Sequence, residues 1–325
     1  MPPYELIVTL GPASNEEDQW SRMTAAGATA FRLNTSHLTL EALSNWLDRL
    51  NDFFERHKKL VPIVLDLQGS KRRLGQVSPM ELEVGQQITL QLGKTCPNAE
   101  IIPVPHADFF KALLQSSGEV VLNDAKTRLK VEQVNTETAI ARVVLGGLLT
   151  PHKGITVPDT AFRVESLSEK DTAIIQSTRG AELVELAISY IRDAEEMKRY
   201  AGWVGPDRRV IAKLEREAAM LEAVQIAEAS SALWVCRGDL GAEVGLVRMA
   251  ELVARVSGQL SLLKTPVNMA GQVLEHMSVS PTPTRSEVCY LFDTLRAGYA
   301  GFVLSDEAAV GKYPLEAVKA AAMFR

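Results

Sequence analysis

Acidic and basic side chains stand directly at or after the ends of short apolar runs. Lys213 and Glu215 close the run that begins at Val210, and Asp239 follows the run that ends at Cys236. Residues two apart on an extended strand point to the same side, so Lys213 and Glu215 can face one site. Two carboxylates with few competing His or Cys side chains favour a hard cation, Mg²⁺ or Mn²⁺, over zinc. A lysine beside that cation can neutralise charge developing on a carbonyl or a phosphoryl group in transfer.

Polar residues stand at equivalent positions elsewhere in the chain: Arg32, Asn34, Ser36, Asp66, Arg237, Ser305, Asp306 and Glu307. Each of these features has a purely structural alternative. A Lys and a Glu near one strand end often form only a surface ion pair, and Asp239 in Arg237-Gly238-Asp239 can simply cap a helix after a tight turn. A functional interpretation is favoured because all these groups would meet at one end of one architecture, where Arg32 can supply a second cation.

Eight apolar runs, each followed by a helical stretch, would position these residues. They span residues 6–10, 29–33, 61–65, 183–188, 210–214, 232–236, 265–269 and 301–304. Helical patterns cover 16–26 and 40–57, for example. Eight such units predict an α/β protein with a closed (β/α)₈ TIM barrel, because closure leaves no parallel strand exposed at an edge. An open doubly wound sheet has the same pattern.

The pattern changes between the third and fourth runs. Residues 82–92 alternate apolar and polar side chains, and residues 118–143 hold further short β-rich runs. These features predict an inserted β domain at 71–157, with the barrel formed by 1–70 and 158–325. Ser168 and Asp171 then have the spacing of a helix start.

Composition excludes several classes of protein. The 325 residues exceed what one hydrophobic core usually holds, and 46% hydrophobic with 23% charged residues is ordinary for a globular chain. A net charge of -5 provides no basic field for nucleic acid. No apolar run reaches the length of a membrane span and no leader precedes the first strand, so we expect a cytoplasmic protein without membrane contact. Cys96, Cys236 and Cys289 are widely spaced, which favours neither a disulfide framework nor a zinc site.

The chain resembles the pyruvate kinase family over nearly its whole length. The blocks that carry the resemblance are Thr9-Leu10-Gly11-Pro12-Ala13-Ser14, Arg32-Leu33-Asn34-Thr35-Ser36-His37, Leu65-Asp66-Leu67-Gln68-Gly69, Lys153-Gly154-Ile155-Thr156-Val157-Pro158, Ser189-Tyr190-Ile191-Arg192, Lys213-Leu214-Glu215, Arg237-Gly238-Asp239-Leu240-Gly241, Pro283-Thr284-Arg285-Ser286-Glu287 and Gly311-Lys312-Tyr313-Pro314-Leu315-Glu316-Ala317-Val318. Their order and spacing follow the family.

The resemblance implies a barrel interrupted after strand three by a small β-barrel lid. It implies transfer of a phosphoryl group from phosphoenolpyruvate to ADP, giving pyruvate and ATP, with Mg²⁺ or Mn²⁺ as cofactor. The implied residues are Lys213, Arg32 and Ser305 in catalysis; Gly238, Asp239, Gly271 and Ser189 at the substrate; Arg73, Asn34 and His37 at the nucleotide; Glu215 and Asp239 on the metal; and Asn34, Ser36, Asp66, Leu67 and Lys71 in the monovalent-cation region.

Some residues depart from the family pattern. Gly271 replaces a threonine that takes part in protonating enolpyruvate, so it has no side chain to help deliver a proton. Leu67 and Lys71 alter the potassium region, and a lysine at the position of Lys71 supplies the positive charge in some family members. We therefore expect that K⁺ is not required. Asn123-Asp124-Ala125 stands where the family lid has Asp-Asp-Gly.

The resemblance covers the family's barrel and lid, and we expect its C-terminal domain to be absent. Activation by sugar phosphates is then not expected, whereas a homo-oligomer formed through the barrel is compatible with the sequence.

Two other functions stay open. One is a Mg²⁺-dependent lyase or aldolase-like enzyme that acts on a pyruvate enolate or another 2-oxo acid, with Gly271 opening space for a larger electrophile. The other is a non-catalytic protein that retains the scaffold. Nucleotide binding separates the kinase from the lyase. The intact set of Lys213, Glu215 and Asp239 counts against the non-catalytic alternative, because buried charges are costly to keep.

Overall fold

The computed structural model of the protein describes residues 3–58, 60–96, 98, 101–123, 126–158, 160 and 167–325. The chain divides into two compact units. The first unit comprises Met1–Gly69, Ser168–Arg237 and Glu251–Arg325, and the second comprises Ser70–Leu167 and Gly238–Ala250. The assignment of residues 71–157 as an inserted lid remains a proposal, and the second unit takes in residues 238–250 as well.

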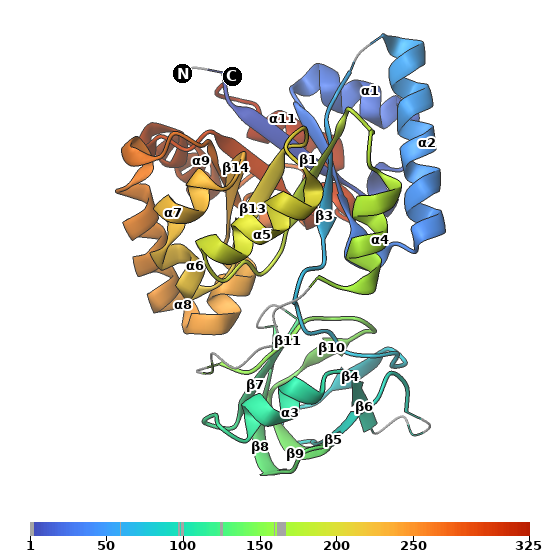
Figure 1. Cartoon of the computed structure of the whole chain (residues 1–325), viewed down its shortest axis with the longest axis vertical. Coiled ribbons are helices and arrows are strands. Elements are labelled where there is room, and N and C mark those ends of the chain that lie inside the picture. Colours follow the sequence, from blue (N-terminus) through green and yellow to red (C-terminus); the bar gives the residue numbers. More distant parts are fainter. Residues whose placement is uncertain are drawn as a thin grey trace. The chain divides into compact units, whose positions relative to one another are not determined.

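The first unit is built on a closed barrel of eight parallel strands (Figure 1). Around the barrel, the strands are β1 (Glu5–Leu10), β2 (Ala30–Asn34), β3 (Ile63–Leu67), β12 (Val184–Ile188), β13 (Val210–Leu214), β14 (Ala232–Cys236), β15 (Val267–Ala270) and β16 (Gly301–Leu304). The barrel closes where β1 pairs with β16, with Leu6 opposite Phe302. This confirms the predicted α/β barrel, and each strand begins and ends within two residues of its predicted apolar run.

Helices follow the barrel strands. They are α1 (Glu17–Ala26), α2 (Leu40–His57), α4 (Glu169–Ser177), α5 (Ala194–Val204), α6 (Glu217–Leu221), α7 (Ala223–Glu228), α8 (Arg237–Ser257), α9 (Arg285–Ala297), α10 (Asp306–Ala309) and α11 (Pro314–Ala321). In α2, Thr39 caps the first turn while Leu43, Leu50 and Phe53 are buried on one face, which is why this segment is a helix packed on a sheet. Among the described residues, no helix combines the length and the apolar character that crossing a membrane requires.

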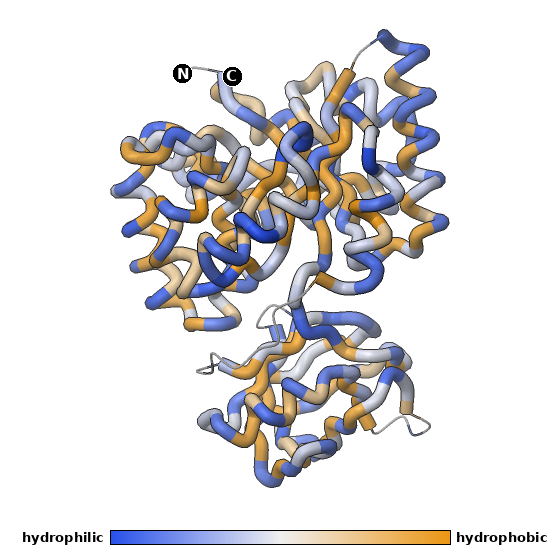
Figure 2. Tube along the Cα trace, viewed as in Figure 1, coloured by the Kyte–Doolittle hydropathy of each residue, from blue (hydrophilic) through white to orange (hydrophobic). Residues whose placement is uncertain are grey.

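The barrel interior is filled by apolar side chains from alternate strand positions. Its largest member is Trp234, which shares a cluster with Ile7, Val64, Ile211 and Val303. The same cluster contains four alanines, Ala30, Ala187, Ala232 and Ala270. Small side chains leave room for one indole, so the interior is a packed core. Figure 2 shows the strands of this unit as largely apolar segments.

The second unit has its own sheets and its own core. A six-stranded sheet has the order β11-β7-β8-β9-β5-β6, and β10 pairs with β4. The bounds are β4 (Met80–Leu82), β5 (Gln87–Leu92), β6 (Ile101–Val104), β7 (Glu119–Leu122), β8 (Thr127–Val134), β9 (Thr138–Leu145), β10 (Gly147–Leu149) and β11 (Ile155–Thr156), with α3 (Ala107–Leu113). Phe109 and Phe110 on α3 are buried in a core that this unit does not share with the barrel interior.

We expected this β-rich unit to form a small barrel. In the part that is described, its strand order is linear, because β11 and β6 lie at the two edges of the six-stranded sheet. The family-based expectation about the Asn123-Asp124-Ala125 turn concerns two residues, Asp124 and Ala125, that lie outside the described residues.

Candidate active site at the barrel mouth

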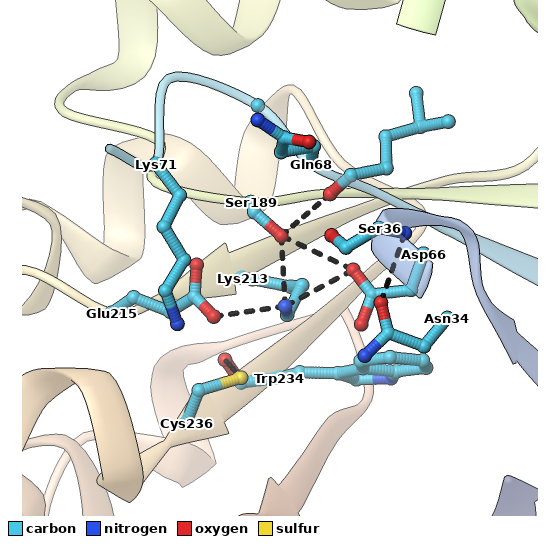
Figure 3. A network of polar contacts seen from close by, with 12 residues as sticks. Asn34, Ser36, Asp66, Gln68, Lys71, Ser189, Lys213, Glu215, Trp234 and Cys236 are labelled. Atoms are coloured by element: carbon cyan, nitrogen blue, oxygen red, sulfur yellow. Dashed lines mark hydrogen bonds and ion pairs between the residues drawn. The ribbon is translucent and has the colours of Figure 1, made fainter. Parts of the chain in front are cut away.

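Lys213, near the C-terminal end of β13, lies among three oxygen partners (Figure 3). Its Nζ is 2.8 Å from Glu215 Oε1, 3.0 Å from Asp66 Oδ1 and 2.8 Å from Ser189 Oγ. The Lys213 side chain is 10% exposed, whereas those of Asp66 and Glu215 are 2% and 1% exposed. One ammonium group is therefore shared by two buried carboxylates and a hydroxyl, which in turn donates to Leu67 O at 2.7 Å.

Arg32 on β2 extends this network by one strand. Its Nη2 and Nε donate to Asp66 Oδ2 at 2.5 and 2.8 Å, and its Nη1 donates to Thr9 Oγ1 at 2.7 Å. Arg32, Asp66, Ser189, Lys213 and Glu215, which we call the mouth cluster, come from the C-terminal ends of β2, β3, β12 and β13. Their convergence is the geometry that the sequence pattern predicts for a barrel active site.

The charges of the mouth cluster stabilise one another. Burial alone would raise the pKa of Asp66, but the Lys213 ammonium and the Arg32 guanidinium outweigh burial and hold that pKa below its usual range. Burial alone would lower the pKa of Lys213, but Asp66 and Glu215 raise it. At neutral pH the cluster therefore keeps a protonated lysine and an ionised aspartate at a site from which water is largely excluded. Fixed charges of this kind can stabilise negative charge that forms on a substrate.

Backbone features around the cluster hold its members in place. A Cβ at Gly69, where φ is +61°, would lie 2.1 Å from Ser189 O, so only glycine allows the chain after β3 to approach Ser189 this closely. Asp171 accepts from the backbone N–H groups of Gln68 and Gly69, both at 3.0 Å. Tyr190 N donates to Glu215 Oε2 at 2.8 Å.

The sequence analysis named Thr9, Asp171 and Tyr190, but it gave none of them a role in the active site. Thr9 pairs in register with Arg32 across β1 and β2, and only the strand pairing shows that they are neighbours. Asp171 accepts hydrogen bonds from backbone N–H groups about a hundred residues earlier in the chain, and a contact to the backbone cannot be recognised from residue types.

Gly271 and Ser305 lie on a different part of the same unit. Arg237 Nη2 donates to Gly271 O at 2.6 Å and to Gln272 O at 2.9 Å, and the φ angles of Gly271 and Gln272 are +77° and +53°. The missing side chain at 271 therefore has a conformational reason, because residues with a Cβ rarely adopt this φ. The loop after β15 is held in this shape by Arg237, which the sequence analysis placed among the polar residues after strand ends.

Glu307, at the start of α10, links the loops that follow β15 and β16. Its carboxylate accepts from Ser305 N at 3.0 Å and from Leu274 N at 3.4 Å. The side chain is fully buried, and burial raises the pKa of Glu307 to about 7. This carboxyl group can therefore exchange a proton near neutral pH beside Ser305, which the family resemblance implies to be catalytic.

Three further predicted residues of the first unit, Asn34, Ser36 and His37, lie at the end of β2 and on the turn that follows it. The Asn34 side chain accepts from Ser36 N at 3.2 Å, and His37 ends the short helix Thr35–His37. Thr35 Oγ1 donates to Asp66 O at 2.7 Å, which attaches this turn to β3. Four residues of the predicted monovalent-cation region, Asn34, Ser36, Asp66 and Leu67, therefore belong to one unit.

In the second unit, the structure brings together Lys71 and Asp239. Lys71 Nζ forms an ion pair with Asp239 Oδ1, and the two side chains are 11% and 15% exposed. Asp239 lies with Gly238 in the first turn of α8. Arg73, the predicted nucleotide contact, donates from Nη1 to His152 O at 2.9 Å, and its backbone N–H donates to His106 Nε2 at 2.9 Å.

The donors available for a metal are carboxylate oxygens. Among the described residues, no group of three or more His, Cys, Asp or Glu side chains could hold a metal ion. Mg²⁺ does not need such a cage, because it keeps several waters and takes further oxygens from an anionic substrate. By donor type, the Glu215 carboxylate of the first unit and the Asp239 carboxylate of the second unit each suit Mg²⁺ or Mn²⁺ better than a structural zinc ion.

These features define the class of protein: an α/β barrel with an interlinked cluster of Arg, Asp, Ser, Lys and Glu at the C-terminal strand ends, where barrel enzymes carry their active sites. The family model described as pyruvate kinase, barrel domain, matches residues 2–318. The chain belongs to the pyruvate kinase family, as the sequence blocks predicted.

Three relatives illustrate this relationship. A pyruvate kinase of Methylorubrum extorquens is 33% identical over 316 residues, which are 97% of this chain and 66% of the relative. One of Thermotoga maritima is 30% identical, over 97% of this chain and 68% of its own length. Pyruvate kinase II of Salmonella typhimurium is also 30% identical, over 98% and 68%. The chain thus spans about two thirds of the length of the curated relatives that it matches.

Proposed function

We propose that this chain is a Mg²⁺-dependent phosphotransferase that transfers a phosphoryl group from phosphoenolpyruvate to ADP, forming pyruvate and ATP without a requirement for K⁺. The observation that carries the proposal is the buried Lys213 ammonium held by Asp66, Glu215 and Ser189 at the barrel mouth. The names of the relatives support the same reaction.

In this reaction the bond between phosphorus and the enol oxygen breaks, and an oxygen of the ADP β-phosphate forms a new bond to phosphorus. Lys213 would stabilise the charge on the transferring phosphoryl group and then on the enolate oxygen, and Arg32 would hold a phosphate oxygen. Glu215 and Asp239 would hold Mg²⁺ or Mn²⁺, which supplies additional positive charge when bound. Arg73, Asn34 and His37 would contact the nucleotide, and Gly238 and Ser189 the substrate.

The second half of the reaction adds a proton to the enolate carbon. Gly271 has no side chain to deliver it, so we assign this step to the region of Ser305. Glu307 supports that assignment, because its carboxylate accepts from Ser305 N and its pKa is raised to about 7 by burial.

Independence from K⁺ would come from Lys71. Its ammonium group would bring a permanent positive charge to the monovalent-cation region, and in this structure it pairs with Asp239. No exchangeable monovalent cation is then needed for charge balance at this position.

A second candidate function is favoured by Gly271. Because residue 271 has no side chain, the enolate could react with a larger electrophile in place of a proton. That reaction is of the lyase or aldolase class, and it requires no nucleotide.

The test is an assay coupled to lactate dehydrogenase, with phosphoenolpyruvate, ADP and Mg²⁺, at constant ionic strength with and without K⁺. We expect turnover that does not depend on K⁺ and a loss of about a thousandfold in Lys213→Met. The matched control is Arg209→Met. Arg209 stands just before β13, at the opposite end of the barrel, and pairs with Glu185. Its replacement should leave turnover unchanged.

Turnover that needs K⁺ would contradict the role of Lys71. Absence of turnover, with calorimetry showing Mg²⁺-dependent binding of oxalate but none of ADP, would reject the kinase and favour the lyase.

A further inference from the structure

The ion pair between Lys71 and Asp239 places an ammonium group on a carboxylate that the proposed function assigns to a divalent cation. Both side chains belong to the second unit and are largely buried, with exposures of 11% and 15%. A charge-assisted hydrogen bond between such groups is among the stronger polar contacts in proteins, and little water is available to screen it.

A divalent cation that approaches Asp239 meets two obstacles. Lys71 Nζ already occupies Oδ1, and its positive charge repels a second cation at the same carboxylate. Lysine can leave this position, because its ammonium is a point charge on a flexible four-carbon stem and is not tied to one orientation as a guanidinium fork would be.

We propose that Lys71 competes with the divalent cation for Asp239, so that Lys71 sets how tightly the substrate-free protein binds the metal. The inference rests on the proposed function in one respect, namely that Asp239 is a metal ligand. Binding of the metal requires Lys71 to move away from Oδ1, and the free protein therefore holds the metal weakly. An anionic substrate adds negative charge and favours the metal over the lysine.

The experiment measures Mn²⁺ binding to the substrate-free protein from the electron paramagnetic resonance signal of free Mn²⁺. We expect Lys71→Met to bind Mn²⁺ at least about tenfold more tightly than the wild type. Lys71→Gln keeps a hydrogen-bond donor but no charge, and it should also bind Mn²⁺ more tightly than the wild type. This second variant keeps the test valid if the methionine variant does not fold.

The matched control is Lys130→Met, which removes one positive charge from an exposed lysine of the same unit that donates to Ser117 O. Its Mn²⁺ affinity should equal that of the wild type. Equal shifts in the Lys71 and Lys130 variants would overturn the proposal, because they would reflect net charge alone.

Asp239→Asn separates this inference from the function on which it rests. We expect it to lose Mn²⁺ binding with Lys71 either present or replaced. Wild-type Mn²⁺ affinity in Asp239→Asn would overturn the metal assignment, and the competition with it. Loss of binding in Asp239→Asn, with no shift in the Lys71 variants, would overturn the competition and leave the assignment intact. None of these readouts depends on turnover.

Discussion

The two ends of the barrel both carry charged side chains, but they arrange them differently. At the C-terminal end, Lys213 and Asp66 each contact several members of the mouth cluster. At the N-terminal end, the contacts are pairwise: Arg209 Nη1 is 2.9 Å from Glu185 Oε1, and Asn268 Nδ2 donates to Glu5 Oε2 at 2.7 Å.

Exposure differs as well. Arg209 is 46% exposed, so its pair with Glu185 lies at the rim of a small cavity of about 110 Å³ that Trp234 also lines. Charges that stay in contact with water cost little and contribute little. Charges buried as deeply as Asp66 and Lys213 carry a desolvation cost that is offset only when all of them are present. We infer that the polar pairs at the N-terminal end serve to hold strands together, whereas the mouth cluster at the C-terminal end provides fixed charges for a substrate.

The sharpest test of this comparison is to remove one cation from each end. We expect Lys213→Met to lower the free energy of unfolding by about 3 kcal/mol, because it leaves the buried Asp66 and Glu215 without their shared cation. Arg209→Met should cost at most about 1 kcal/mol, as an exposed pair does. Urea denaturation at pH 7 measures both. Equal losses at the two ends would mean that the mouth cluster is no more interdependent than the pairs at the other end.

The next effect concerns pH at the mouth. The pKa of Glu307 is about 7 in the folded chain and about 4.5 when unfolded, so the folded state binds more protons between these values, and stability falls as pH rises through this window. Glu307→Gln should remove this dependence, which amounts to about 2 kcal/mol between pH 5 and pH 8. The measurement is the difference in unfolding free energy between wild type and variant at several pH values. A difference that stays constant with pH would contradict the raised pKa.

The smallest effect is expected at the loop after β15. Gly271→Thr should destabilise the fold by about 1 kcal/mol, because φ at this position is +77°, and it should not increase turnover. Gly271→Ala is the matched control, since it adds the same backbone strain without a hydroxyl group. If the threonine variant were faster and the alanine variant were not, the missing hydroxyl would matter more for the reaction than the shape of the loop.

The sequence predicted the barrel well because each strand is a short apolar run with a polar end, and this pattern depends only on local burial. Lys213 and Glu215 were placed on one side of a strand by their spacing, and the structure brings both to the mouth cluster. Convergence of Arg32 and Asp66 followed from the architecture once eight units had been counted.

Other features were beyond what a sequence pattern contains. The bond from Arg32 to Thr9 depends on strand register, and the ion pair of Lys71 with Asp239 joins segments that are far apart in the chain. The linear order of the second unit's sheet was also not predicted, because alternating runs indicate strands without fixing which strands become neighbours. The reason for Gly271 became visible only in its φ angle.

The pairing of β1 with β16 has a consequence for how the protein is made. Arg32, Asp66, Ser189 and Lys213 lie in or directly after neighbouring strands that leave the ribosome well before β16, whereas Ser305 and Glu307 emerge after it. Contacts between segments this distant in the chain form late and slowly. The mouth cluster can thus assemble on a nascent sheet that is still open. The contacts of Ser305 and Glu307 can form only after β16 has been synthesised.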